Sequence, residues 1–176
     1  MKQLLITLLA IANFVGLATA QNALFVDFRN GYHQVVESME ARGYVEIEST
    51  QPGQELIVSA HGANYAYRFN QGWLYEIEMT RAFAKRRTAK QAFKGCLAYF
   101  ELIKAEQIAI VEDDRHRKEM VFVRQGRVYH LRYKTLADGS IQVSLRSRYT
   151  ANTPLTDWEP YDYEAGYDVI QTLNNE

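Results

Sequence analysis

The chain has 176 residues, of which 47% are hydrophobic and only three are proline, and its formal net charge is −1. This composition excludes an intrinsically disordered chain, which would combine low hydrophobicity with high net charge. The single cysteine, Cys96, excludes an internal disulfide, so a hydrophobic core must hold the fold together.

The first twenty residues, MKQLLITLLAIANFVGLATA, have the layout of a secretory signal peptide. A positive charge at Lys2 precedes an apolar run, and the segment closes with the small-residue pattern Ala18-Thr19-Ala20. Asn13 interrupts the run, and a membrane span needs about 20 largely apolar residues. We therefore expect a signal peptide at 1–20 and a periplasmic or secreted protein with no membrane span after cleavage. Export also argues against a nucleic-acid partner.

Two segments that lie 64 positions apart repeat one pattern. ELIVSAHGANYAYRF, residues 55–69, aligns with EMVFVRQGRVYHLRY, residues 119–133, and Gly62 matches Gly126. Each copy is typical of two strands joined by a two-residue turn that ends in glycine, because glycine takes the positive φ that tight hairpins need. The sequence therefore predicts one β-hairpin used twice.

The residues around each hairpin extend it into a larger unit. A helix with apolar residues at three-to-four spacing precedes each copy, and strand-like stretches lie on both sides of it. We therefore predict an α+β fold, a tandem duplication of a helix plus four-stranded antiparallel sheet unit. The units are expected at 29–82 and 88–149, with the basic linker AFAKRRT between them and an acidic, aromatic tail at 150–176.

Hairpin geometry assigns the side chains to two faces of the sheet. Across a two-residue turn Val58 pairs with Tyr65 and Leu56 with Tyr67, so the aromatic face should pack against the helices. The other face is predicted to be open, acidic in the first unit and basic with an apolar centre in the second. We predict that a partner binds at this basic face and the tail, and the candidate residues are Val121, Val123, Val128, His130, Arg132, Arg146, Arg148 and Trp158.

The tail combines six acids with large apolar groups and has no Lys or Arg from Thr150 to Glu176. Its aromatic residues favour docking on the body, with the acids near Arg132, Arg146 and Arg148 or near the bases of the linker. The alternative is a solvated tail whose aromatic residues serve a partner.

The order of elements behind a signal peptide resembles the β-lactamase inhibitor protein fold and the related duplicated periplasmic proteins called PepSY-like. The resemblance covers about residues 29–149 and lies in element order and internal duplication. It implies a concave sheet surface that grips a partner protein. The inhibitor carries disulfides that this chain cannot form, so none of its contact residues is transferred to this sequence.

Patterns for catalysis or metal binding are weak. The sequence has no GxSxG, HExxH, CxxC or phosphate-binding glycine loop. Asp114, His116 and Glu119 lie near one another in a charged stretch that is typical of a solvated hairpin tip, and Cys96 is expected to be a buried, inert thiol. A basic cluster could meet phosphate or acidic lipid, although a solvated linker and helix face is the favoured interpretation. Its members are Lys85, Arg86, Arg87, Lys90 and Lys94.

Two classes of function follow. The favoured one is an exported, non-enzymatic binding module, without a cofactor, that engages an envelope or extracellular protein or peptide through the open sheet face. The alternative is a small-molecule carrier or an unrecognised hydrolase with a pocket between the units. A protein-binding face should be broad, with exposed valines among arginines, whereas a carrier needs a deep apolar pocket with a few convergent polar groups.

Overall fold

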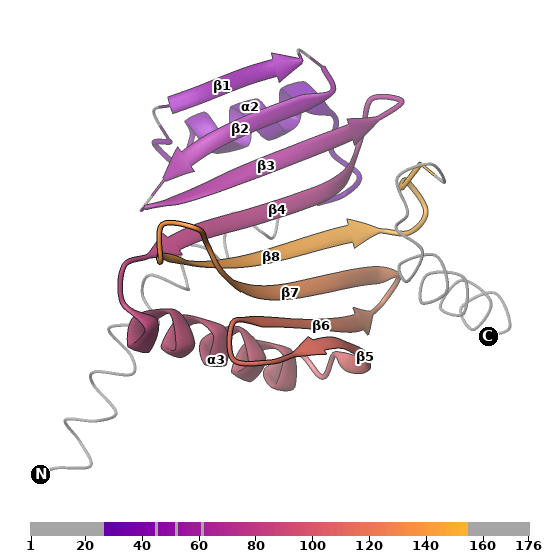
Figure 1. The fold of residues 1–176 in the computed structure, drawn as a ribbon. Helices are drawn as coiled ribbons and strands as arrows, with labels where there is room; N and C mark the ends of the chain where they lie inside the picture. Colours follow the sequence, from indigo (N-terminus) through magenta and orange to yellow (C-terminus); the bar gives the residue numbers. More distant parts are fainter. Residues whose placement is uncertain (1–26, 45, 52, 61, 155–176) are drawn as a thin grey trace, which may run out of the picture.

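The computed structural model describes residues 27–44, 46–51, 53–60 and 62–154, without the side chains of 46–50. The predicted signal peptide and residues 155–176 of the predicted tail lie outside this part of the chain. The described residues form an α+β fold with two helices and one antiparallel sheet (Figure 1). None of their helices is long and apolar enough to cross a membrane.

Each half of the described chain contains one helix followed by four strands. The first half comprises α2 (Tyr32–Glu40), β1 (Glu46–Gln51), β2 (Glu55–Ala60), β3 (Ala63–Asn70) and β4 (Trp73–Phe83). The second comprises α3 (Arg86–Leu102), β5 (Glu106–Asp113), β6 (Arg117–Arg124), β7 (Arg127–Thr135) and β8 (Ile141–Tyr149). The predicted linker is therefore shorter than expected, because β4 runs to Phe83 and α3 begins at Arg86, two residues before Thr88.

Both predicted hairpins are confirmed. Val58 lies opposite Tyr65 and Leu56 opposite Tyr67, as a two-residue turn requires. The turn glycines, Gly62 and Gly126, have φ values of 73° and 70°, in the left-handed region that a residue with a β-carbon avoids. These turns fix the register and thereby decide which side chains face the helices.

The eight strands form one continuous sheet in the order β1-β2-β3-β4-β8-β7-β6-β5. The last strand of the first half, β4, pairs antiparallel with the last strand of the second half, β8, from Glu76 opposite Arg148 to Phe83 opposite Ile141. Figure 1 shows this junction at the middle of the sheet, with β1 and β5 at the two edges. We call the β4–β8 pair the central junction.

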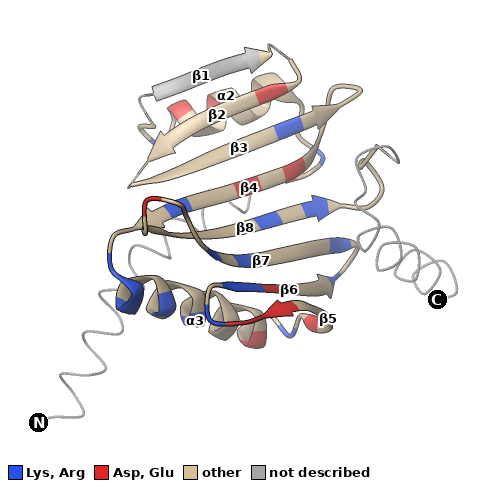
Figure 2. Ribbon diagram, in the orientation of Figure 1, with Lys and Arg blue, Asp and Glu red and all other residues tan. Residues whose placement is uncertain are grey.

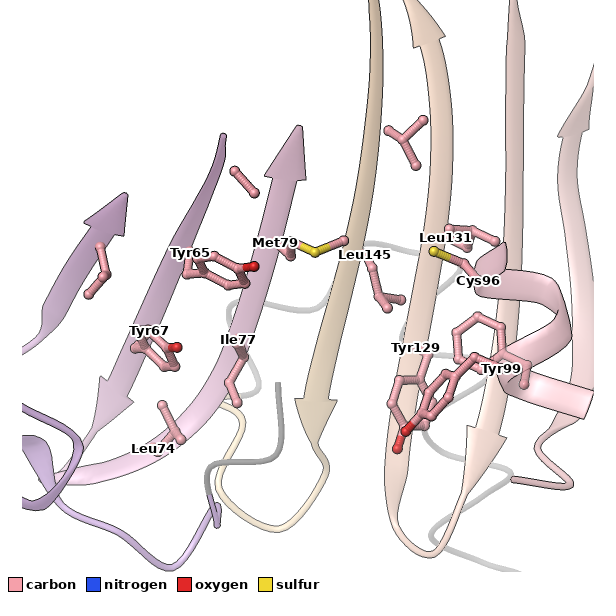
Figure 3. Packing of buried hydrophobic residues seen from close by; sticks show 14 of the residues in the cluster. Tyr65, Tyr67, Leu74, Ile77, Met79, Cys96, Tyr99, Tyr129, Leu131 and Leu145 are labelled. Atoms are coloured by element: carbon pink, nitrogen blue, oxygen red, sulfur yellow. The ribbon is translucent and has the colours of Figure 1, made fainter. Parts of the chain in front are cut away.

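Both helices pack against the same face of the sheet and enclose the core. The Tyr67 hydroxyl donates a hydrogen bond to the Met39 sulfur of α2 at 3.3 Å. On the other side of the central junction, the Phe100 ring of α3 stacks on Phe122 with 4.2 Å between ring centroids. Figure 3 shows Cys96 and Tyr99 of α3 directed toward Leu131 and Tyr129 of β7. The aromatic side chains that alternate along the hairpins are therefore core residues.

The first residues of the predicted tail are part of the folded body. The Asn152 side-chain amide donates to the backbone oxygens of Phe28 and Leu74, both at 3.1 Å. The Asn70 side-chain amide donates to the Asn152 carbonyl oxygen at 2.9 Å. The segment 150–154 thus ties the end of β8 to the start of the described chain.

Candidate functional site

The predicted binding residues that the structure describes share one face of the sheet, opposite the helices. Arg148 of β8 lies between Glu76 of β4 and Val128 of β7. In the next row, Arg146 lies between Glu78 and His130. Val121 and Val123 lie opposite His130 and Val128, and Arg132 lies opposite Glu119 and Ser144. Trp158 lies outside the described residues.

This face is not the open surface that the sequence analysis expected. The valines Val121 and Val128 and the imidazole of His130 have no exposed area, and Arg146 and Arg148 are only 7% and 5% exposed. Val123 and Arg132 are half-buried. The prediction of exposed valines among arginines is therefore wrong for most of these residues.

Cross-strand ion pairs lie on this face near the central junction. Glu76 accepts hydrogen bonds from Arg148 of β8 and from Arg68 of β3, and the side chains of Glu76 and Arg148 are 2% and 6% exposed. Arg68 also contacts Glu55 at 3.1 Å and Glu78 at 3.3 Å. Such pairs hold long side chains along the sheet, where their apolar stems cover neighbouring residues.

A second charged group lies nearer the β5 edge. Arg132 Nε is 2.8 Å from the Glu119 carboxylate, and His130 Nδ1 is 3.5 Å from the same oxygen.

The acids near the central junction also act on the pKa of Arg68. Burial lowers this pKa, but the charges of Glu76 and Glu78 outweigh the effect of burial and raise the pKa above its ordinary value. The face therefore carries cations that are engaged with acids of the same sheet.

A cavity lies on the helix side of the sheet, in the second half of the chain. It has a volume of about 560 Å³ and lies where α3 passes beside the turn between β5 and β6. Its apolar wall consists of Phe93 and Leu97 from α3, Met120 from β6 and Tyr133 from β7. This volume is within the range of about 300–1,000 Å³ that is usual for small-molecule sites. We call it the α3 pocket.

Charged residues surround the α3 pocket, and cations exceed acids among them. The cations are Arg86, Lys90, Lys94, Arg115 and Lys118, and the acids are Asp113 and Asp114. Figure 2 shows Lys and Arg gathered at the start of α3.

Both acids are engaged within their own hairpin. Asp113 forms an ion pair with Lys118. The Asp114 carboxylate accepts the backbone N–H groups of His116 and Arg117, at 2.5 and 2.6 Å, and these hydrogen bonds lower its pKa. In the part of the chain that the structure describes, Lys90, Lys94 and Arg115 form no ion pair, so they give the pocket an uncompensated positive charge.

The turn beside the pocket is fixed on both sides. The Arg86 guanidinium of α3 donates to the backbone carbonyl of Arg115. The Thr135 backbone N–H at the end of β7 donates to the His116 carbonyl at 2.9 Å. The pocket wall that the turn provides is therefore held in place by α3 and by the sheet.

Two residues that line the pocket each have one buried polar atom without a partner among the described residues. The Tyr133 hydroxyl and the Arg86 Nε are buried and have no hydrogen-bond partner among the described residues. Tyr133 is only 2% exposed, so solvent does not satisfy its hydroxyl. A buried polar group without a partner carries a cost of about 1–3 kcal/mol.

The residues considered for catalysis or metal binding do not come together. His33 lies on α2, His116 in the β5–β6 turn and His130 inside the opposite face. Glu119 is paired with Arg132 on that face, away from Asp114 and His116. No group of three or more His, Cys, Asp or Glu side chains is placed to hold a metal ion within the described ranges. Burial raises the pKa of the Cys96 thiol to about 12, so it is protonated at neutral pH.

The sequence analysis included three of the pocket's cations, Arg86, Lys90 and Lys94, in its basic cluster but assigned that cluster to a solvated linker and helix face. A stronger signal was present in their spacing. Arg86, Lys90 and Lys94 recur every four residues and lie one beside another on α3, next to the row of Phe93 and Leu97. The contribution of the β5–β6 turn could not be inferred, because it depends on how the hairpin folds against α3.

Comparison with protein-family models, with curated proteins and with solved structures finds no match for this chain.

Proposed function

We propose that this protein is an exported, non-enzymatic binding module that holds a small molecule in the α3 pocket. The observation that carries the proposal is the cavity of about 560 Å³, in which an apolar wall meets several convergent polar groups. That combination is characteristic of small-molecule sites. The sequence analysis offered a protein-binding module and a small-molecule carrier, and the geometry favours the carrier. The pocket lies within the second half of the chain and not between the two units, where the sequence analysis had expected it.

Burial on the opposite face supports this choice. A protein-binding surface gains most of its affinity from apolar or aromatic anchors that are exposed before binding. Val121 and Val128 have no exposed area, and the arginines beside them are nearly buried. The face as described therefore offers few side chains to a partner protein.

A protein or peptide partner remains a second candidate, at a different location. The edge strand β5 exposes Ile108, Ile110 and Val111, and the end of α3 exposes Leu102. Exposed apolar residues on an edge strand are a surface on which another chain can pack. Register irregularities on both sides of Ile110 interrupt the β5–β6 ladder, so contacts through side chains are favoured over addition of a regular strand. If Ile110→Lys leaves capture of envelope proteins unchanged, this candidate is excluded.

We also infer that the fold arose by tandem duplication of a helix plus four-stranded unit. The equal order of elements in the two halves and the two matching hairpin turns support this inference. The central junction adds a further argument. Arg68 lies opposite Glu76 in the first half, and its counterpart Arg132 lies opposite Ser144 in the second, so Glu76 and Ser144 are equivalent positions. Two residues further along, Glu78 and Arg146 are therefore equivalent too. These two residues lie directly opposite each other across the central junction, as expected if the two halves are related by a twofold axis there. Superposition of 29–82 on 88–149 tests the inference, and different strand paths in the two halves would refute it.

A filled pocket tests the proposed function. Leu97→Trp places a large ring in the α3 pocket, whereas Leu102→Trp adds the same ring to the same helix at a position that is 74% exposed. We expect Leu97→Trp to abolish binding of an amphiphilic dye such as anilinonaphthalene sulfonate, and Leu102→Trp to leave it unchanged. Equal binding by both variants and the unmodified protein would show that the pocket is not the site.

A further inference from the structure

The α3 pocket has a charge pattern that specifies a class of ligand, and the argument rests on the proposed function. We infer that the pocket binds an anionic amphiphile, with a single anionic head group at Lys90, Lys94 and Arg115 and an aliphatic or aromatic body against Phe93, Leu97 and Met120. Four observations lead to this inference.

The first observation is a row of like charges. Arg86, Lys90 and Lys94 lie at successive four-residue spacings on α3, so each cation is a neighbour of the next. Like charges at this spacing destabilise a helix. An anion bound between them removes this repulsion, whereas a cation would increase it and a neutral ligand would leave it.

The second observation is the position of the row at the start of the helix. The first turn of α3 contains no acid, and the residue at its N-cap, Lys85, supplies no side-chain cap. Because the helix dipole makes this end positive, acidic residues are the ones that stabilise it. The pocket residue Arg86 lies there instead, so the dipole adds to the positive field at this end of the pocket.

The third observation is the state of the nearby acids. Asp113 is engaged with Lys118, and Asp114 with two backbone N–H groups of its own turn. Asp114 keeps its negative charge, but the five cations around the pocket exceed the two acids. An anionic head group that enters the pocket would meet Lys90, Lys94 and Arg115, which form no ion pair among the described residues.

The fourth observation is the adjacent apolar wall. Phe93 and Leu97 form a second row on α3, next to the cations, and Met120 faces them from β6. A free inorganic anion would not use this wall. A ligand with both a charged head and an apolar body uses all of these groups.

The inference is tested by titrating the purified protein with two probes that share one alkyl chain. Dodecanoate carries a carboxylate and dodecanol a neutral hydroxyl, and both are followed by displacement of anilinonaphthalene sulfonate and by isothermal titration calorimetry below their aggregation limits. We expect dodecanoate to bind at least about tenfold more tightly than dodecanol, since hydrogen bonds to charged groups are stronger than neutral ones. Added salt should weaken dodecanoate more than dodecanol.

Variants then locate the head group. The double variant Lys90→Gln, Lys94→Gln should reduce the dodecanoate affinity about tenfold and leave that of dodecanol unchanged. Arg87→Gln is the matched control, because Arg87 lies in the same helix but does not line the pocket, and it should change neither affinity.

The outcomes separate this inference from the proposed function. Equal affinity for the two probes, with both blocked by Leu97→Trp, would overturn the anionic ligand while the binding function stands. Failure of both probes to bind would overturn both. Binding to vesicles of anionic phosphatidylglycerol, without binding of free dodecanoate, would overturn the pocket ligand in favour of a membrane surface.

Discussion

Glu76 and Arg148 form an ion pair across the central junction, and it connects the last strand of one half with the last strand of the other. Both side chains are almost completely buried, and Arg68 binds the same carboxylate from the first half. Removing one partner of a buried pair leaves the other charge uncompensated, which costs much more than loss of an exposed pair.

Glu76→Gln should therefore lower the free energy of unfolding by about 3 kcal/mol. Glu78→Gln is the control, because Glu78 contacts the same arginine, Arg68, with a side chain that is 25% exposed, and it should cost less than about 1 kcal/mol. Urea denaturation followed by circular dichroism measures both. Equal effects in the two variants would show that the buried pair has no special role at the junction.

The turn glycines give a second prediction. Gly62→Val and Gly126→Val should each destabilise the protein by more than about 1 kcal/mol, because a β-branched residue is strained at positive φ. Gly62→Asn is the matched control, since asparagine tolerates the left-handed region and should cost less than Gly62→Val. Melting temperatures of the three variants check this. Unchanged melting in both valine variants would contradict the observed turn geometry.

The unpartnered hydroxyl of Tyr133 gives a third prediction, on the stability of the free protein. Tyr133→Phe should leave that stability unchanged or increase it, because removal of an unsatisfied buried group has no cost in lost hydrogen bonds. Urea denaturation of the variant and of the unmodified protein measures this. A clear loss of stability in Tyr133→Phe would mean that the hydroxyl has a partner in the free protein.

The buried thiol predicts a pH dependence. Burial raises the pKa of Cys96 from 9.0 to about 12, so the folded protein keeps a proton that the unfolded chain releases above pH 9. The resulting stability is complete below the unfolded pKa and is lost as pH rises toward the folded pKa. The unmodified protein should therefore lose more free energy of unfolding between about pH 8 and pH 10.5 than Cys96→Ala does.

Urea denaturation at the two pH values measures this difference. The buried tyrosines, whose pKa values are also raised, contribute equally in both proteins, as with Tyr65 and Tyr99, each at about 12. Identical losses in the two proteins would show that the thiol does not couple to folding.

The end of the chain gives a fifth prediction. Residues 150–154 are hydrogen-bonded to the body, so truncation after Pro154, not after Thr150, isolates the predicted tail. If the tail docks through its aromatic residues, at about 25 cal/mol per Å² of apolar area buried, this truncation should lower the melting temperature and increase dye binding. Unchanged stability with loss of a captured partner would make the tail a recognition element instead.

Local patterns in the sequence were sufficient for the hairpins and the core. The glycine turns fixed the pairing of Val58 with Tyr65, and once this register is set every second residue must face the helices. The same logic placed Arg146 and Arg148 on the opposite face. Local periodicity determines such features because they depend on neighbours a few residues away.

Long-range features could not be obtained in this way. The pairing of β4 with β8 joins residues that are 72 positions apart at Glu76 and Arg148, and no periodic pattern specifies it. The burial of Val121 and Val128 was not predicted either, because alternation along a strand assigns a side chain to a face and does not say whether that face is covered. The position of Lys90 in a pocket could not be predicted either, because a solvated lysine and a lysine that lines a pocket have the same local sequence pattern.

The central junction also has a consequence for assembly. Among the described elements, only Ala84 and Lys85 connect the two halves, and the halves meet through the final strands of each. A second copy can present its own β8 to the same β4 with identical hydrogen bonds, so two molecules can exchange their second halves and form a reciprocal, domain-swapped dimer. Short connections favour such exchange, and insertion of several glycines after Ala84 should return a dimer to the monomer. Light scattering of the two proteins at high concentration would detect the difference, and equal masses would show that the hinge does not control exchange.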